Sequence, residues 1–420
     1  MKKILVVGSG GREHAIVDAL SHSPQVEKIY CAPGNAGIAR QAECVAIGAE
    51  EIEQLADFAE KNGIDLTVVG PEASLCAGIA NEFERRGLKI FGPTKEAARI
   101  ESSKEFAKEI MMKKNVPTGA FQTFEDFEEA LDYVRKGKLP TVIKYDGLAA
   151  GKGVVVAQSL EEAGMALRDM LLDENFGSGK VLIEEFLDGP EFSFMCMVNG
   201  DKVYPLAMAQ DHKRAFEDDK GPNTGGMGAY SPVDFVTEEV ERRAYDEIMK
   251  PVAEALSEEG TPFRGLLYGG LILTEDGPKV IEFNARFGDP ETEVVLPRLE
   301  SDLVEMIEAV MEKRDYTAKW SDEGCLGIVV AAEGYPGSYR KGIKLEIPEN
   351  DYRLTVYHMG TKASDDGIVS AGGRILMAVG RDKDLRKARE TALESVEKIA
   401  PEGGVFYRKD IGKKSLGKEK

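Results

Sequence analysis

Short apolar runs alternate with helical patterns along the first hundred residues. The runs predict strands at 4–7, 28–32, 44–47, 66–69 and 89–92, and the segments between them predict helices at 11–21, 50–61 and 76–86. Alternation of this kind is typical of a parallel sheet covered by helices. We therefore expect an α/β domain of Rossmann-like architecture at residues 1–101.

The middle of the chain, residues 102–325, follows a different pattern. It predicts helices at 103–114, near 237–259 and from about 290, a strand meander over 180–208 and a strand pair within 265–285. Strands that follow one another after short turns usually pair antiparallel, so we expect this domain to be α+β.

From residue 326 to 420 short strands lead to one long helix, predicted at 382–400. Its apolar positions recur at helical spacing and fall on one face: Leu385, Ala388, Ala392, Val396 and Ile399. We expect a small C-terminal α+β domain here, which makes the whole chain a multidomain α/β and α+β protein.

The stretch YDGLAAGKGVVV, residues 145–156, contains the glycines and the lysine of a phosphate-binding loop. A P-loop, however, needs four residues between its glycines and a hydroxyl residue after its lysine. Here three residues separate Gly147 from Gly151, and a glycine follows Lys152. The run after Gly153 is β-branched and predicts a strand, whereas a P-loop leads into a helix. We therefore predict a hairpin flap.

The first turn, GSGGRE, is only partly a dinucleotide-binding loop, because Glu13 stands where that fingerprint needs its last glycine. The second predicted strand ends in APGNAG, residues 32–37, without the acidic residue that would bind the ribose of NAD. A nicotinamide dehydrogenase is therefore disfavoured. Backbone amides of the two loops are suited instead to hold one phosphate at a helix N-terminus.

The segment KVIEFNARFGDPETE, residues 279–293, is the strongest candidate for chemistry. Alternation along a strand places Glu282 and Asn284 on one face together with Val280, and the residues between them on the other. A carboxylate beside an amide oxygen is a pair of hard ligands suited to Mg²⁺. An ordinary half-exposed strand with polar residues facing water explains the same pattern.

Two features follow this strand. Arg286 offers a two-pronged donor for a phosphate or a carboxylate. The dipeptide Asp289-Pro290 predicts the N-cap and the first position of the next helix.

The polar segment 210–232 carries a group of charged and amide side chains: Asp211, His212, Lys213, Arg214, Asn223 and Thr224. A long loop inside a compact domain is usually functional or disordered. Among the lysines, Lys144 lies on a predicted strand beside apolar neighbours, where a cation facing a phosphate is reasonable. Lys104 alone predicts an ordinary surface lysine, and His14 a structural histidine.

Composition narrows the possible partners. The net charge of −20 argues against nucleic acid, because that binding depends on neutralised phosphates. No apolar run approaches the roughly 20 residues needed to span a bilayer, so we expect no membrane partner. Five scattered cysteines form no CxxC pair and predict reduced thiols in a cytoplasmic protein.

Together these motifs resemble the phosphoribosylamine-glycine ligase family of the ATP-grasp superfamily. The matching segments are spread over essentially the whole chain: VVGSGGREHA, APGNAG, VVGPEA, IKYDGLAAGKGV, EEFLDG, AQDHKRAF, GPNTGGMGAYSP, IEFNARFGDPE and YRKDIG. The resemblance implies a Rossmann-like N-terminal domain, an ATP-grasp core at 102–325 whose mobile flap, about 120–190, closes over ATP, and a C-terminal domain at 326–420. It also implies ATP-dependent joining of glycine to 5-phosphoribosylamine through glycyl phosphate.

The resemblance assigns the site residues by group. The ATP phosphates would contact Lys104 and Lys144, under the flap residues Gly151, Lys152 and Gly153, and the nucleoside would contact Glu184, Glu185, Leu187 and Glu191. Mg²⁺ or Mn²⁺ would bind Glu282 and Asn284. The acceptor site would comprise Asp211, Lys213, Arg214, Asn223, Thr224, Arg286, Gly288 and Asp289, with Gly10, Asn35 and Gly37 at the phosphoribosyl group. Direct catalytic roles would belong to Arg286, Lys144 and Asp289.

Two alternatives stay open. One is another ATP-grasp carboxylate–amine ligase or carboxylase with a different acceptor, and the more distant one is a dehydrogenase that uses the first domain. In each case we expect small-molecule substrates and a monomer or a weak homo-oligomer.

Overall fold

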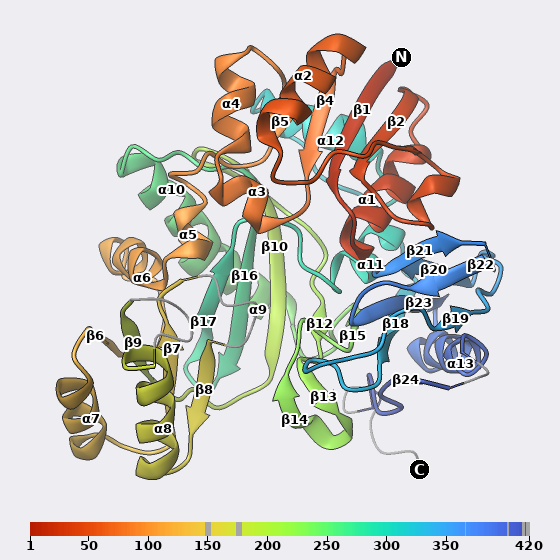
Figure 1. Ribbon diagram of the computed structural model, residues 1–420. Helices are drawn as coiled ribbons and strands as arrows, with labels where there is room; N and C mark the ends of the chain where they lie inside the picture. Colours follow the sequence, from red (N-terminus) through yellow and green to blue (C-terminus); the bar gives the residue numbers. More distant parts are fainter. Residues whose placement is uncertain (148–152, 174–178, 366, 401–402, 414–415, 417–420) are drawn as a thin grey trace.

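The structure is a computed structural model, and it describes residues 1–147, 153–173, 179–365, 367–400, 403–413 and 416. Five parallel strands form the N-terminal sheet, in the order β3-β2-β1-β4-β5. They are β1 Lys2–Gly8, β2 Val26–Pro33, β3 Glu43–Cys44, β4 Leu66–Val69 and β5 Ile90–Phe91. The helices beside them are α1 Gly11–Ser21, α2 Ile52–Asn62, α3 Glu72–Cys76 and α4 Ile79–Arg85 (Figure 1). The Rossmann-like prediction is confirmed.

Two elements of this domain differ from expectation. The helix predicted at 76–86 is divided, because Gly78 has a φ of +94° and separates α3 from α4. A left-handed residue of this kind ends one helix before the next begins. Strand β3 spans two residues where four were predicted.

An antiparallel sheet in the order β11-β10-β16-β17 forms the centre of the molecule (Figure 1). Its strands are β10 Glu191–Asn199, β11 Lys202–Pro205, β16 Arg264–Thr274 and β17 Gly277–Asn284. The helices around it are α5 Arg99–Ser102, α6 Lys104–Lys113, α9 Glu238–Ala244, α10 Lys250–Glu258, α11 Thr292–Val295 and α12 Leu303–Met311. Alternate side chains of β10 belong to two different apolar clusters, so the sheet is buried on both faces.

A second antiparallel sheet, in the order β6-β9-β7-β8, has its own small core. It contains β6 Phe121–Phe124, β7 Thr141–Tyr145, β8 Val154–Ala157 and β9 Val181–Glu185, with α7 Phe127–Lys136 and α8 Leu160–Leu171 packed against it. The predicted hairpin is present, because β7 pairs with β8. The meander predicted over 180–208 was wrong in one respect: β9 pairs with β6 and β7, not with β10.

The third sheet joins strands from both sides of residue 325. Its order is β12-β15-β18-β23-β20, and β24 Val405–Phe406 pairs with β18. The strands are β12 Gln210–Asp211, β15 Gly228–Ser231, β18 Gly324–Ala332, β20 Leu354–His358 and β23 Arg374–Asp382. Helix α13 Leu385–Val396 packs on this sheet with its predicted apolar face. Smaller strands complete the region: β13 Arg214–Phe216, β14 Lys220–Asn223, β19 Lys344–Leu345, β21 Thr361–Ser364 and β22 Gly367–Ser370.

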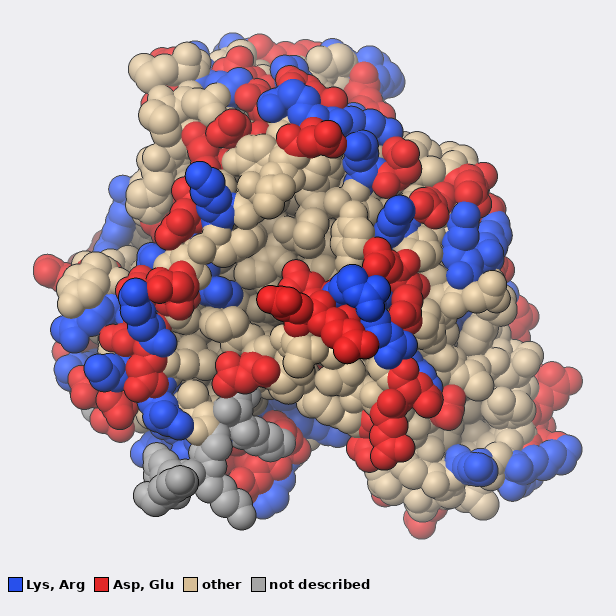
Figure 2. Space-filling view, turned by 180° about the vertical axis from the view of Figure 1, so that it is seen from behind, with Lys and Arg blue, Asp and Glu red and all other residues tan. Residues whose placement is uncertain are grey.

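On the face seen from behind, Lys and Arg side chains are interspersed with Asp and Glu (Figure 2). An extended basic surface is the usual footprint of nucleic-acid binding, and this mixed face does not resemble one. Over the residues that the structure describes, none of the helices combines the length and the apolar character that a membrane crossing requires.

Candidate active site

Strand β17, which carries the two predicted metal ligands, contains a β-bulge just before them. Two neighbouring residues of β16 pair with Glu282 and Val280, so Ile281 between them has no partner. The extra residue shifts the alternation of side chains by one position. Val280 therefore shares an apolar cluster with Phe283, and the prediction that it shares a face with Glu282 was wrong. Glu282 and Asn284 do lie on one face.

The bulge turns a carbonyl group toward Lys144. Lys144 Nζ donates to Ile281 O over 2.8 Å and lies 3.1 Å from Glu184 Oε2. Lys108 Nζ of α6 is also 3.1 Å from that oxygen, and all three charged side chains are at most 6% exposed. One carboxylate thus balances two buried ammonium groups. The remaining positive charge is suited to an anionic ligand.

A single carboxylate, Glu282, lies among several cations. Burial raises its pKa, but nearby positive side chains outweigh that effect and the pKa is lowered; they are Lys213, Lys144, Lys104 and Arg286. Lys213 Nζ is 3.7 Å from Glu282 Oε1. Burial lowers the pKa of Lys104, and Glu282 opposes that shift. Glu282 is therefore ionised, as a metal ligand must be.

Lys104 and Lys213, two of the cations around Glu282, each have a further partner. Lys104 is half-buried, and its Nζ donates to Gly147 O at the start of the flap turn over 3.0 Å. Lys213 Nζ lies 3.3 Å from Glu191 Oε2. Burial raises the pKa of Asp211 to about 7, and Lys213 opposes this while other carboxylates add to it. Asp211 therefore titrates near neutral pH, where a general acid or base is most effective.

Arg286 is held by two carboxylates. Its Nη2 lies 3.1 Å from Glu101 Oε1, and its Nε lies 3.3 Å from Glu72 Oε2. Burial lowers the pKa of Arg286, but both carboxylates raise it and the net shift is upward. The predicted two-pronged donor is present, although an anionic ligand would share it with these partners.

Glu282 and Asn284 fit a divalent cation. When the Asn284 amide nitrogen faces Glu101 Oε1 it donates over 3.1 Å, and this orientation satisfies both groups. The amide oxygen is then free of this contact, on the same face of β17 as the Glu282 carboxylate, and both groups are hard ligands. Within the described ranges, His, Cys, Asp and Glu form no group of three or more at metal-site geometry. Phosphate oxygens would therefore have to complete the coordination.

The residues after β17 do not begin a helix as predicted. Helix α11 begins only at Thr292, with Glu291 at the N-cap position, so Asp289 is not a cap. The Asp289 carboxylate instead pairs with Arg374 Nη1 at 2.8 Å, and the same nitrogen donates to Gly225 O over 2.6 Å. Gly288 N donates to a methionine sulfur. A tertiary ion pair has replaced the local cap.

The polar segment 210–232 is an ordered hairpin, not a disordered loop. Arg214 pairs with Asn223 across β13 and β14, and Arg214 Nη1 donates to Gly221 O over 2.8 Å. Thr224 Oγ1 donates to Lys213 O over 2.8 Å. Only Lys213 and Asp211 of this segment are coupled to Glu282; Arg214, Asn223 and Thr224 shape the hairpin beside it.

The two N-terminal loops meet as predicted. Asn35 Nδ2 donates to Ser9 O over 2.8 Å, and Asn35 Oδ1 accepts from Gly37 N over 2.9 Å. A Cβ on Gly10 would lie 3.5 Å from Asp289 Oδ2. The first loop therefore lies beside Asp289, one of the residues predicted for the acceptor site.

The remaining predicted nucleotide residues that the structure describes lie at the end of β9 and just before β8. Glu185 is exposed and Leu187 is half-buried. Gly153 is buried, and its carbonyl accepts a backbone hydrogen bond from β7. Gly151 and Lys152 lie outside the described residues.

Sequence reasoning missed several ionisable residues around the site: Glu72, Glu101, Lys108, Glu293 and Arg374. Lys108 lies four residues after Lys104 on α6, so helical spacing could have revealed it. Arg374 stands at the start of β23, far along the chain, and no local motif marks it.

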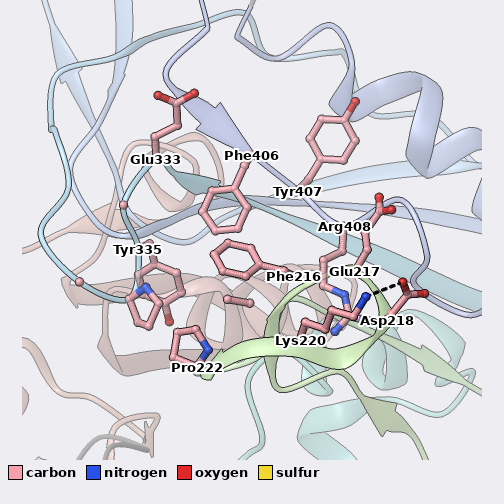
Figure 3. Close-up of a pocket in the computed structure, with 14 residues that line it drawn as sticks. Phe216, Glu217, Asp218, Lys220, Pro222, Glu333, Tyr335, Phe406, Tyr407 and Arg408 are labelled. Carbon is pink, nitrogen blue, oxygen red and sulfur yellow. Dashed lines mark hydrogen bonds and ion pairs between the residues drawn. The ribbon is translucent and has the colours of Figure 1, made fainter.

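A separate cavity of about 740 Å³ lies between the β13–β14 hairpin and the C-terminal strands. The aromatic rings of Phe216, Tyr335 and Phe406 lie around it in Figure 3, whereas the ring of Tyr407 points away. None of the predicted site residues lines it. The predicted site residues gather instead in the charged cluster around β17.

Comparisons with known proteins cover all three regions. Profiles of the phosphoribosylglycinamide synthetase N domain, ATP-grasp (A) domain and C domain match residues 2–101, 102–292 and 325–414. A phosphoribosylamine--glycine ligase from Halalkalibacterium halodurans is 51% identical over 418 residues, which is 98% of this chain and 97% of that protein.

Comparison with solved structures supports the same family. A crystal structure of phosphoribosylamine--glycine ligase from Thermotoga maritima has a TM-score of 0.85 and 33% identity, and covers 98% of this chain and 100% of its own. A biotin carboxylase from Campylobacter jejuni has a TM-score of 0.74 at 16% identity, covers 97% of this chain and 92% of its own, and shows the fold alone. By these matches, the chain belongs to the phosphoribosylglycinamide synthetase family of ATP-grasp ligases.

Proposed function

We propose that the chain catalyses the ATP-dependent joining of glycine to 5-phosphoribosylamine, giving glycinamide ribonucleotide, ADP and phosphate in purine biosynthesis. Family membership over the full chain supports this reaction. The observation that carries it is the convergence of three lysines on Glu282: Lys104, Lys144 and Lys213. Phosphoryl transfer needs a carboxylate that can bind a metal ion, surrounded by cations that can bind phosphate oxygens.

The chemistry has two steps. The carboxylate of glycine resists attack by an amine until one of its oxygens becomes a leaving group, so the γ-phosphoryl group of ATP is first transferred to it. The amine nitrogen of phosphoribosylamine then forms the C–N bond to glycyl phosphate, phosphate leaves, and the nitrogen loses a proton. Asp211, which titrates near neutral pH, is placed to accept a proton.

The side chains have separate roles. Lys104 and Lys144 hold the ATP phosphates, and Arg286 stabilises the charge that develops on the transferred group. Asp289 contacts the acceptor. A divalent cation at Glu282 and Asn284 would supply further neutralisation of phosphate charge.

The binding residues are proposed by group. The nucleoside contacts Glu184, Glu185, Leu187 and Glu191, under Gly151, Lys152 and Gly153 of the flap. The acceptor site comprises Asp211, Lys213, Arg214, Asn223, Thr224, Gly288 and Asp289, with Gly10, Asn35 and Gly37 at the phosphoribosyl group. Closure of the flap would exclude water and protect the acyl phosphate.

The test is ADP release with ATP, Mg²⁺, glycine and phosphoribosylamine, with each acceptor omitted in turn. We expect ADP only when both acceptors are present. ADP formation without glycine would refute the reaction and favour the alternative, a carboxylase or another carboxylate–amine ligase with the same fold.

We further infer three domains, at 1–101, 102–325 with a mobile flap at about 120–190, and 326–420, in a cytoplasmic monomer or weak homo-oligomer. All five cysteines are free, which supports a reducing compartment. Sedimentation velocity across a concentration series tests the oligomeric state.

A further inference from the structure

The carboxyl group of Glu293, on α11, is buried beside the candidate site without hydrogen bonds to its neighbours. Its exposure is 0%, and neither of its oxygens has a hydrogen-bond partner among the other described residues. A Cβ on Gly11 would lie 2.4 Å from Glu293 Oε1, so the carboxyl group is pressed against the first turn of α1. Only glycine leaves room for it there.

Three charged side chains and one titratable hydroxyl, that of Tyr357 on β20, face Glu293 from the surrounding elements. Asp289 comes from the loop before α11, Arg374 from β23 and Arg12 from α1. Both cations already have partners, because Arg374 pairs with Asp289 at 2.8 Å and Arg12 pairs with Glu13 at 2.6 Å. Among the described residues, Glu293 forms no ion pair of its own.

An ionised carboxylate in such a place is costly. Burial without a hydrogen bond penalises the charged form, and a second carboxylate nearby adds repulsion. Burial and Asp289, in that order, hold the pKa of Glu293 well above its ordinary value. Two adjacent carboxyl groups with one proton between them are a stable arrangement.

We propose that Glu293 is a positioning residue that stays protonated beside Asp289, so that the Asp289 carboxylate keeps its ion pair with Arg374 and serves the amino group of the acceptor. The identity of the acceptor rests on the proposed function. The Asp289 carboxylate holds Arg374 through their ion pair, and Arg374 Nη1 in turn donates to the Gly225 carbonyl. Loss of the proton from Glu293 would place two negative charges side by side and weaken this arrangement.

The first experiment locates the proton without any substrate. The unfolding equilibrium of the full chain is measured in urea from pH 4.5 to 9 for the wild type and Glu293→Gln, whose neutral amide has nearly the same shape. An acid whose pKa is raised by folding loses stability as pH rises above its ordinary value of 4.5. The unfolding constant of the wild type, relative to Glu293→Gln, should therefore increase by up to about tenfold per pH unit.

The control is Glu394→Gln, on the exposed side of α13. Its ratio to the wild type should stay nearly constant over the same pH range. A constant ratio for Glu293→Gln as well would overturn the proposal, because Glu293 would then be no more protonated in the folded state than in the unfolded state.

The second experiment tests the positioning role. We expect Glu293→Gln to keep kcat/KM for the amine acceptor within about threefold of the wild type near neutral pH, and to lack the fall that the wild type shows at alkaline pH. A tenfold loss at neutral pH, or an unchanged alkaline fall, would overturn the role. If neither protein uses the amine at all, the proposed function fails, while the urea measurement still decides where the proton resides.

Discussion

The Glu184→Gln substitution tests the charge balance beneath the proposed ATP site. Glu184 Oε2 lies 3.1 Å from both Lys144 Nζ and Lys108 Nζ, and all three side chains are almost fully buried. The amide has the same shape but no charge. Both ammonium groups therefore lose their only carboxylate within ion-pair distance among the described residues.

The size of the effect follows from this geometry. Breaking a buried ion pair by removing one partner typically costs about 3–5 kcal/mol. The upper limit is set by deprotonation of one lysine: from its ordinary pKa of 10.5, deprotonation at pH 7 costs about 5 kcal/mol, at about 1.4 kcal/mol per pH unit. We expect Glu184→Gln to lower the free energy of unfolding by about 3–5 kcal/mol.

The lysines determine whether the stability of Glu184→Gln rises or falls with pH. Burial lowers the pKa of Lys108, so above the folded-state pKa and below 10.5 the unfolded chain binds more protons than the folded one. Stability then rises with pH, and the deficit of Glu184→Gln should shrink as pH approaches 10.5.

Hydrogen exchange of the amides in β7 and β9, together with urea unfolding, measures the change locally and globally. The control is Asp132→Asn on α7, which breaks a pair with Lys136 whose side chains are 52% and 76% exposed. An exposed pair of this kind should change stability by at most about 0.5 kcal/mol. A loss below about 1 kcal/mol for Glu184→Gln, or a loss that does not depend on pH, would refute the reasoning.

Three further predictions concern other parts of the site. Glu282→Ala should lower turnover by orders of magnitude with an unchanged circular dichroism spectrum; near-normal turnover would exclude Glu282 as a metal ligand. Arg374→Ala should raise KM for the amine acceptor and destabilise the fold by about 2–4 kcal/mol, because Asp289 loses its partner; an unchanged KM in steady-state kinetics would contradict this. Burial lowers the pKa of His14 to about 3, so the fold should lose stability as pH falls from 6.5 toward 3; His14→Gln should lose less in acid-unfolding curves, and equal acid sensitivity would contradict the cause.

Elements whose determinants are local could be predicted from the sequence. Strand β4 has the predicted bounds, and α6 begins after Ser103, whose side chain accepts a hydrogen bond from Phe106 N. Each of these elements is specified by a signal of its own, such as a cap, an apolar period or a β-branched run. Each signal lies within the element or within a few residues of it. The same holds for the glycine-rich hairpin of β7 and β8.

Features that depend on distant partners could not be predicted. Whether β9 pairs with β7 or with β10 is decided by packing, because the turn between β9 and β10 permits either. Asp289 has a strong local cap signal, but its ion pair with Arg374 competes with that signal and prevails. Glu293 has no signal in sequence at all, since its unusual environment arises only when α1 meets α11.

The bulge at Ile281 should tolerate substitution of its side chain but not deletion of the residue. Its contribution to Lys144 is a main-chain carbonyl, which every amino acid supplies, so exchanging the side chain leaves that contact available. Deleting the residue would still leave Glu282 and Asn284 on their face, since regular alternation from Val280 places them there, but it would remove the acceptor of Lys144. The identity of residue 281 thus carries little information about function, while its presence carries much: a survey of point substitutions would pass over a position that a single-residue deletion would expose.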